Sequence, residues 1–400
     1  MKTRMRPSVF MMDLLATVPY YTAYLSQALL NHSVSLTVGS ISYYLDPSCF
    51  AARGISLNPG LSDRVGKLNL SRTPRRIFKL FEAMLNILVL AVRFLVHCPD
   101  VIHVQYLPML RWSLPFDLWL VRFARVRGAK IILTIHDLLP HDTAELHKTL
   151  FKSLYQSVDA IICHSAIVKD RLVAEFGVAP SDISVIPHGP FFYDLPVADP
   201  LIHTTAGSPL IVLWQGIVFP YKGVDLLLDA WQQVEASGIS AELHIVGTGA
   251  PELLDTLHAQ VNTLSLQRVM MDFRFISPEE LIVRYRSADI VVYPYRAITT
   301  SGALATGLAL GKAIVASDLP VFRELLLDRE NALLVDPADR DQLANALVTL
   351  LKDSTMRDRF AARISALDFG DASWRSIAAC TAKVYDDVCG LSQRSEEPCR

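Results

Sequence analysis

Apolar residues in this chain of 400 residues gather in short runs that alternate with longer stretches of helical periodicity. In the first half, the short apolar runs lie at 8–12, 35–38, 99–106, 129–137 and 183–189. The stretches that carry an apolar residue at every third or fourth position lie at 20–30, 77–96 and 112–127. Strands that alternate with helices in this way predict β-α-β units and therefore a parallel sheet.

The second half repeats the pattern after a proline-rich stretch without periodicity, which predicts a linker. Its apolar runs lie at 210–216, 242–246, 288–293 and 313–316, with helical stretches at 224–231 and 251–262. We therefore expect an α/β chain of two domains. The expected segments are a first domain at 1–190, a linker at 191–208, a second domain at 209–370, a helix at 371–390 and a tail at 391–400.

The stretch 293–317 carries the first candidate chemistry. A polar loop, Thr299-Thr300-Ser301-Gly302, follows an apolar strand and stands where a helix begins. The unpaired backbone N–H groups and the dipole of a helix N-terminus favour an anion there, and small residues let a phosphorylated ligand approach. Threonine and serine are also ordinary helix caps, so a cap and a phosphate site are both open for this loop.

A second loop supplies a cation in the same half of the chain. An apolar strand ends at Gly216, and Lys222 and Gly223 precede the next helix. A lone lysine is usually solvated, but the carboxyl ends of parallel strands share one edge of a sheet. Lys222 and the helix N-terminus at Ser301 would together suit a diphosphate. A third turn, Gly247-Thr248-Gly249, is equally well explained as a tight turn or as a weak nucleotide signal.

These stretches together resemble the C-terminal half of the family 4 retaining glycosyltransferases. Gly216, Lys222 and Gly223 match the family's Gly-Arg-x(n)-Lys-Gly loop, although Ile217 replaces its arginine. The strand 311–317, GKAIVAS, matches the strand that follows the family's Glu-x7-Glu motif.

Both glutamates of that motif are missing from this chain. Thr299 and Thr306 stand at the expected places, and threonine offers only neutral hydrogen bonds where a carboxylate would offer charge-assisted ones. Arg296 could replace the missing loop arginine as a diphosphate cation.

The resemblance implies the glycosyltransferase B (GT-B) fold, in which two Rossmann-like domains with parallel sheets face each other across a cleft and a C-terminal helix returns to the first domain. It also implies metal-independent sugar transfer from a nucleotide-diphosphate sugar, with retention, to a glycan or lipid-linked acceptor. In the family, a histidine at the end of a first-domain strand faces the transferred sugar, and His136 takes that position, although a histidine there is more often structural. The loop at Gly247 would line the base pocket. Asp137 and His141 are acceptor candidates.

Charge is distributed unevenly along the chain. Residues 1–190 carry 20 Lys and Arg against 13 Asp and Glu, whereas residues 191–400 carry 18 against 27. The imbalance can be incidental, or it can reflect an anionic partner of the first domain. A cluster of cations opens the amphipathic helix at 77–96, where the helix dipole disfavours them. They are Arg72, Arg75, Arg76 and Lys79.

We interpret this cluster as a docking site for an anionic membrane surface or for a phosphate of the acceptor. The polar stripe of the helix contains Lys79, Glu82, Asn86 and Arg93, and we expect the opposite, apolar face to pack against the sheet.

Other features bound the setting. The six cysteines form no CxxC pair, which favours a reducing compartment and no structural metal. No uncharged apolar run is long enough to span a membrane. We expect a cytoplasmic protein, either free or peripheral at the inner membrane face, with no cofactor, no metal and no nucleic-acid partner.

Three alternatives to an active transferase remain open. A catalytically degenerate subunit that partners an active enzyme would explain the missing glutamates. A sugar-nucleotide epimerase on the same fold would form product without an acceptor. A membrane-associated scaffold gives no reason for Lys222 beside a loop of small residues.

Overall fold

The computed structural model describes residues 6–57, 60–65, 68, 71–110, 114–139, 144–196, 208–367 and 369–391, and within these it leaves out the side chains of residues 72, 73, 76, 144–146 and 372. His141 and most of the expected linker, 197–207, therefore lie outside the described residues. The chain divides into two compact units. The first unit contains residues 1–187 and 374–400, and the second contains residues 188–373.

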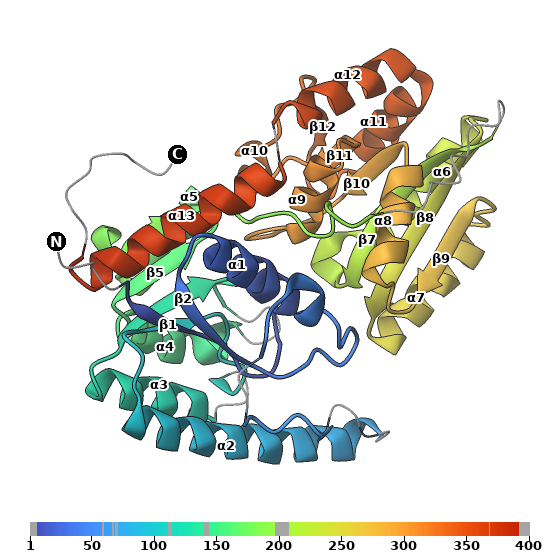
Figure 1. The fold of residues 1–400 in the computed structure, drawn as a ribbon. Coiled ribbons are helices and arrows are strands. Elements are labelled where there is room, and N and C mark those ends of the chain that lie inside the picture. The colour runs from blue at the N-terminus through green and yellow to red at the C-terminus, as the bar shows by residue number, and fades with distance from the viewer. Residues whose placement is uncertain are drawn as a thin grey trace. The chain divides into compact units, whose positions relative to one another are not determined.

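The first unit is built on a six-stranded parallel sheet in the order β2-β1-β3-β4-β5-β6 (Figure 1). Its strands are β1 (Ser8–Asp13), β2 (Ser35–Ser40), β3 (Val101–Val104), β4 (Lys130–Ile135), β5 (Ala160–Cys163) and β6 (Ile183–Val185). Every residue of β3 and β5 is buried, as expected for strands covered on both faces. The apolar runs of the sequence therefore became the central strands of this sheet.

Helices connect these strands and cover the sheet. They are α1 (Pro19–Asn31), η1 (Ala51–Arg53), α2 (Arg72–Val96), α3 (Phe116–Val126), α4 (Ala144–Tyr155), α5 (Ala166–Phe176), η4 (Pro180–Asp182) and α13 (Asp371–Val388). From Trp374 onward α13 belongs to the first unit, where Trp374 stacks on Tyr24 at 5.4 Å between ring centroids. The last helix of the chain therefore completes the core of the domain that is synthesised first.

Helix α2 is amphipathic as predicted, but the prediction that its apolar face packs against the sheet holds only in part: Leu90 and Phe94 are buried in the core, whereas nine other bulky apolar residues of the helix are exposed. Glu82 and Asn86 point inward and are 7% and 1% exposed. The Glu82 carboxylate accepts hydrogen bonds from the backbone N–H groups of Arg64 and Val65, at 2.7 and 3.2 Å, and the Asn86 amide exchanges two hydrogen bonds with the Ser62 backbone. The inner face of α2 therefore supplies hydrogen-bond partners to the backbone of residues 62–65, and the exposed apolar residues lie on the other side of the helix.

The second unit holds another six-stranded parallel sheet, in the order β12-β11-β10-β7-β8-β9 (Figure 1). Its strands are β7 (Leu210–Val218), β8 (Ala241–Gly249), β9 (Val269–Phe273), β10 (Ile290–Tyr293), β11 (Ala313–Ser317) and β12 (Ala332–Val335). Its helices are η5 (Pro220–Lys222), α6 (Val224–Ala236), α7 (Pro251–Thr263), α8 (Pro278–Ser287), α9 (Gly302–Ala309), α10 (Pro320–Arg323), α11 (Arg340–Lys352) and α12 (Ser354–Ser365). The expected α/β class with two Rossmann-like sheets is confirmed.

The predicted strand–glycine turn at Gly247-Thr248-Gly249 is instead the end of a strand. Strand β8 continues to Gly249 and pairs with β7 over its whole length, which places Gly247 opposite Gly216. Gly247 has φ +141°, and a Cβ at this position would lie 1.9 Å from the Gly216 carbonyl oxygen. Only glycine fits here, because the two backbones approach too closely for a side chain.

Candidate functional site

Two loops of the second unit meet at the carboxyl ends of adjacent strands. The loop after β7 contains Lys222 and Gly223, and the loop after β10 begins at Pro294. Gly223 has φ +66°, and a Cβ there would lie 2.0 Å from the Pro294 carbonyl oxygen. The Arg296 N–H also donates to the Tyr221 carbonyl at 2.7 Å. The lysine predicted to bind a diphosphate and the loop that leads into α9 are therefore neighbours in the fold.

The Lys222 ammonium lies over the end of β7. A Cβ on Gly216 would be 2.8 Å from Lys222 Nζ, so the absence of a side chain at Gly216 makes room for the lysine. Lys222 Nζ is also 5.7 Å from the centre of the Tyr295 ring, which is buried. The cation is half-buried and lies close to the backbone of Gly216.

Arg296 forms a bidentate ion pair with Asp225, a residue that the sequence analysis did not single out. Its guanidinium nitrogens lie 2.8 and 2.7 Å from the two Asp225 carboxylate oxygens, and one of them donates to the Pro220 carbonyl. Partial burial alone would raise the pKa of Asp225, but the hydrogen bonds from Arg296 hold it below its usual value. In this structure Arg296 links the two loops, and its charge is matched by Asp225.

The N-terminus of α9 is capped by a side chain. Ser301 Oγ accepts a hydrogen bond from the Leu304 N–H at 3.1 Å. The segment 188–192 covers the first turn closely, since a Cβ on Gly302 would be 2.9 Å from the Phe191 ring and 3.1 Å from the His188 ring. The interpretation as a helix cap is therefore confirmed for Ser301, and the phosphate site stays a prediction.

The Thr306 side chain is buried in the second unit. Only 3% of it is exposed, and its hydroxyl donates to the Gly302 carbonyl at 2.9 Å and accepts from the Phe191 N–H at 3.1 Å. Thr306 thus fixes the segment over α9, with both roles of its hydroxyl in use. Thr299 and Thr300 are half-buried in the loop between β10 and α9.

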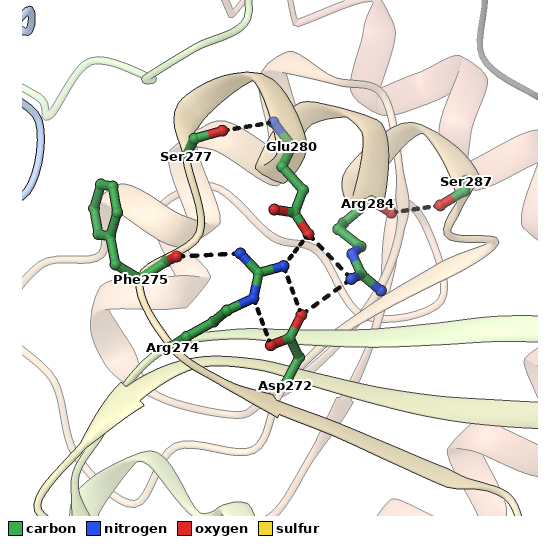
Figure 2. A network of polar contacts seen from close by, with 7 residues as sticks. All are labelled: Asp272, Arg274, Phe275, Ser277, Glu280, Arg284 and Ser287. Carbon is green, nitrogen blue, oxygen red and sulfur yellow. Dashed lines mark hydrogen bonds and ion pairs between the residues drawn. The ribbon is translucent and has the colours of Figure 1, made fainter.

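Four charged side chains form a network at the end of β9 (Figure 2). Asp272 and Glu280 each pair with both Arg274 and Arg284, at distances from 2.5 to 3.1 Å. Arg274 also donates to the Phe275 carbonyl at 3.4 Å, and Ser277 caps α8 through the Glu280 N–H. The network fixes the turn between β9 and α8. Because Arg274 is exposed, each ion pair contributes little stability by itself.

In the first unit, His136 directly follows β4 and is 9% exposed. Its Nε2 lies 3.2 Å from Gln105 Oε1. Its ring contacts Tyr21 edge-on at 4.7 Å and lies 5.2 Å from the His164 ring. A cavity of about 30 Å³ adjoins His136 at the carboxyl ends of β3 and β4, and Asp137 is among its lining residues.

The structural role of Asp13 could not be read from the sequence, because a single carboxylate at the end of an apolar run gives no motif. It is fully buried at the end of β1, and it accepts hydrogen bonds from the Thr17 and Val18 N–H groups at 2.7 and 3.1 Å and from the Thr22 hydroxyl. Burial raises the pKa of Asp13 to about 6, against the lowering effect of these hydrogen bonds. Asp13 shapes the loop that leads into α1.

The cation cluster is described only in part. Lys79 is half-buried, lies 5.1 Å from the centre of the Tyr44 ring, and has its pKa lowered by burial. Arg75 is also half-buried. The side chains of Arg72 and Arg76 lie outside the described residues.

Within the described ranges, no cluster of three or more His, Cys, Asp or Glu residues is arranged to hold a metal ion. No helix among the described residues combines the length and apolar character that a membrane span requires.

Two family models match the chain, one in each half of the sequence. The family described as "Glycosyltransferase Family 4" matches residues 21–189, and "Glycosyl transferases group 1" matches residues 209–353. A phosphatidyl-myo-inositol mannosyltransferase of Mycobacterium leprae is 31% identical over 278 residues, which are 66% of this chain and 69% of that protein. The corresponding enzyme of Mycolicibacterium smegmatis is 32% identical over 175 residues, only 43% of either chain.

Solved structures share the fold. The crystal structure of Anabaena HepE in complex with UDP and glucose has a TM-score of 0.73 and 17% identity, and the match covers 94% of this chain and 100% of that one. At this identity the likeness shows a common architecture of the GT-B type.

Proposed function

The chain belongs to the family 4 glycosyltransferases and is a nucleotide-sugar-dependent transferase, and on that premise we propose that it moves a sugar, with retention and without a metal ion, to a glycan or lipid-linked acceptor. The observation that carries the proposal is the meeting of Lys222 with the loop that opens α9. A cation and a helix N-terminus at the ends of adjacent parallel strands suit the diphosphate of the donor.

The leaving diphosphate is the group that most needs stabilisation during the reaction. Breaking the anomeric C–O bond leaves negative charge on the diphosphate, and catalysis requires groups aimed at that charge. Lys222 supplies a positive charge, and the backbone N–H groups near Ser301 and Gly302 supply dipoles. We propose that these groups stabilise the diphosphate without a metal ion.

The missing glutamates are replaced only in part. Because both roles of the Thr306 hydroxyl are used inside the protein, we assign it to support of the loop rather than to a ribose contact. Thr299 and Thr300 remain as neutral hydrogen-bonding groups for the sugar. We propose a sugar contact for His136 as well, as the family resemblance implies.

The acceptor proposal draws on the names of relatives. One relative is named a phosphatidyl-myo-inositol mannosyltransferase, and another, from Xylanimonas cellulosilytica, is named a D-inositol 3-phosphate glycosyltransferase. Both names describe inositol-containing acceptors, one of them lipid-bound. We therefore favour a polyhydroxylated acceptor with a phosphate or lipid anchor, in glycolipid or polysaccharide assembly.

Calorimetric titration with UDP, GDP and ADP in EDTA tests this function, with Lys222→Ala beside the unchanged protein. We expect one nucleotide to bind without metal and to bind at least tenfold more weakly to Lys222→Ala. Lys312→Ala is the matched control, since this lysine donates to the Arg286 and Ala288 carbonyls away from the donor loops. Absence of binding near millimolar concentration, about −4 kcal/mol, would favour a degenerate subunit over an active enzyme.

The proposal includes peripheral attachment to the cytoplasmic face of an anionic membrane through α2. The outward face of this helix presents nine bulky apolar residues that are 39 to 75% exposed. They are Ile77, Phe78, Phe81, Met84, Leu85, Leu88, Val92, Leu95 and Val96. Trp119 of α3, the helix that packs against α2, is 53% exposed as well. An apolar patch of this size marks an interaction surface.

Charge favours a lipid bilayer as the occupant of this face. Glu82, the only acidic residue of α2, is turned inward, so the outer face carries no negative charge. Arg93 and the neighbouring Arg122 of α3 are exposed cations. An amphipathic helix with cations beside bulky apolar side chains lies in the interface of an anionic membrane.

Vesicle sedimentation tests the attachment. Phe81→Gln combined with Leu88→Gln should weaken binding to anionic vesicles at least tenfold without loss of folding, because both side chains are more than 60% exposed. Leu327→Gln, at a 54% exposed leucine of the second unit, is the matched control. If the double variant bound vesicles as well as the control, or if α2 paired two copies in solution instead, the membrane assignment would fail.

A further inference from the structure

A chain of buried polar groups connects α13 with His136. Tyr385 Oη lies 2.7 Å from His103 Nδ1, and His103 Nε2 lies 3.1 Å from Gln105 Nε2. Gln105 Oε1 then reaches His136 Nε2 at 3.2 Å. Tyr385, His103 and Gln105 are at most 1% exposed, so no bulk water screens these hydrogen bonds.

The orientation of the Gln105 amide decides which groups of this chain donate and which accept. Burial lowers the pKa of His103 to about 3, so its ring is neutral and carries a single N–H. The Gln105 amide nitrogen lies against His103 Nε2 and 2.9 Å from Met11 Sδ, and an amide nitrogen can only donate. His103 Nε2 is therefore an acceptor, which also receives the Thr134 hydroxyl at 2.7 Å. The ring proton of His103 sits on Nδ1 and is donated to Tyr385.

The orientation of Gln105 then decides the protonation of the next ring. With its amide nitrogen toward His103, its carbonyl oxygen faces His136 Nε2 and accepts the proton carried there. A neutral His136 consequently has Nδ1 as its acceptor nitrogen. In a neutral histidine, a hydrogen bond that fixes one ring nitrogen as the donor leaves the other nitrogen as the acceptor.

We propose that Gln105 is a positioning residue, which together with His103 and Tyr385 holds His136 as the Nε2–H tautomer. The catalytic consequence rests on the proposed function: the tautomer decides which ring nitrogen of His136 donates and which accepts during sugar transfer. The tautomer itself is a property of the first unit and does not depend on that function.

Long-range ¹H–¹⁵N correlation spectra of the full-length protein labelled with [¹⁵N]histidine test the tautomers, with His103→Asn and His136→Asn to assign the rings. We expect His103 protonated at Nδ1 and His136 at Nε2. In Gln105→Glu, a carboxylate of similar size can only accept, so His103 should change to Nε2–H or to the charged ring. The proposal would be overturned by an unchanged His103 signal in Gln105→Glu. It would also be overturned if the unchanged protein carried the proton of His103 on Nε2 or that of His136 on Nδ1.

Kinetics separate positioning from a merely structural role. Gln105→Met keeps the length of the side chain and removes both hydrogen bonds, and it should lower kcat about 10- to 100-fold while the KM for the donor stays within twofold. Tyr385→Phe should lower kcat in the same manner, whereas Tyr24→Phe, a buried tyrosine outside this chain of groups, should not. A loss confined to donor KM would contradict the proposal. If no nucleotide bound the unchanged protein, the proposed function would fail and the spectra would still decide the tautomers.

Discussion

Contacts of single atoms fix the conformation of the loops after β7 and β10. At Gly223 the backbone takes a left-handed conformation, and the space where a Cβ would stand is filled by the Pro294 carbonyl oxygen, 2.0 Å away. Asp13 shows the same local control in the first unit, where one carboxylate bonds two backbone N–H groups of the loop before α1. At Gly223, any side chain would require a shift of the backbone.

Gly223→Ala should destabilise the second unit by about 2 kcal/mol or more, because it adds a steric clash to the cost of a left-handed residue. Gly238→Ala is a matched control, since Gly238 has φ +73° and nothing within 4 Å of its Cβ position. This control should cost about 1 kcal/mol. Urea unfolding measures both values, and equal losses would show that Pro294 moves aside freely.

Asp13→Asn should change how stability depends on pH. A carboxyl whose folded pKa is about 6 stabilises the fold below its ordinary value of 3.8, and this contribution is lost as the pH rises to about 6. The variant lacks that loss, so its free energy of unfolding relative to the unchanged protein should improve by about 2 kcal/mol between pH 4 and pH 7. Unfolding in urea across this range tests the slope. Parallel curves would mean that Asp13 titrates at its ordinary pKa.

At the scale of elements, periodicity predicted where helices and strands lie but could not predict which way α2 faces. An amphipathic pattern defines two faces, and it does not say which one meets the protein. The deciding partners of Glu82 and Asn86 lie in residues 62–65, which have no periodicity to show their place. The partner of Arg296 was hidden for a similar reason, since Asp225 is 71 positions away in the chain. Contacts between irregular segments are set by the tertiary fold.

Two substitutions test whether Arg296 holds together the loops that follow β7 and β10. If it holds the loops together, both Asp225→Asn and Arg296→Lys should weaken nucleotide-diphosphate binding about 5- to 10-fold, because each removes the bidentate geometry. Stability should fall by no more than about 1 kcal/mol, since both side chains are partly exposed. Tighter binding by Asp225→Asn would instead show that a released Arg296 contacts the diphosphate itself.

At the scale of the whole molecule, each compact unit has its own sheet and its own buried core. Trp214 and Trp231 are fully buried in the second unit, and Trp374 is 4% exposed in the first. The resemblance in sequence anticipated two Rossmann-like domains and a terminal helix. It could not supply the packing of Trp374 on Tyr24, because that contact joins residues at opposite ends of the chain.

Substitution of these tryptophans should separate the unfolding of the two units. Trp374→Ala should destabilise the first unit by about 3 to 5 kcal/mol, and Trp231→Ala should do the same to the second. Each variant should move one denaturation transition and leave the other within about 0.5 kcal/mol. Circular dichroism combined with tryptophan fluorescence follows both transitions. A common shift would mean that the two units unfold as a single cooperative body.

The late position of α13 in the chain has a consequence for biosynthesis. A ribosome finishes the strands of the first unit early, but it must translate all of His188–Ser373 before it releases the helix that covers Tyr21 and Tyr24. At about 5–20 residues per second this delay is on the order of tens of seconds. During that time the second unit can fold to completion while the first waits with an aromatic surface uncovered. Chaperones that bind nascent chains would therefore meet the first unit before α13 covers it, and the yield of folded protein in overexpression should depend on them.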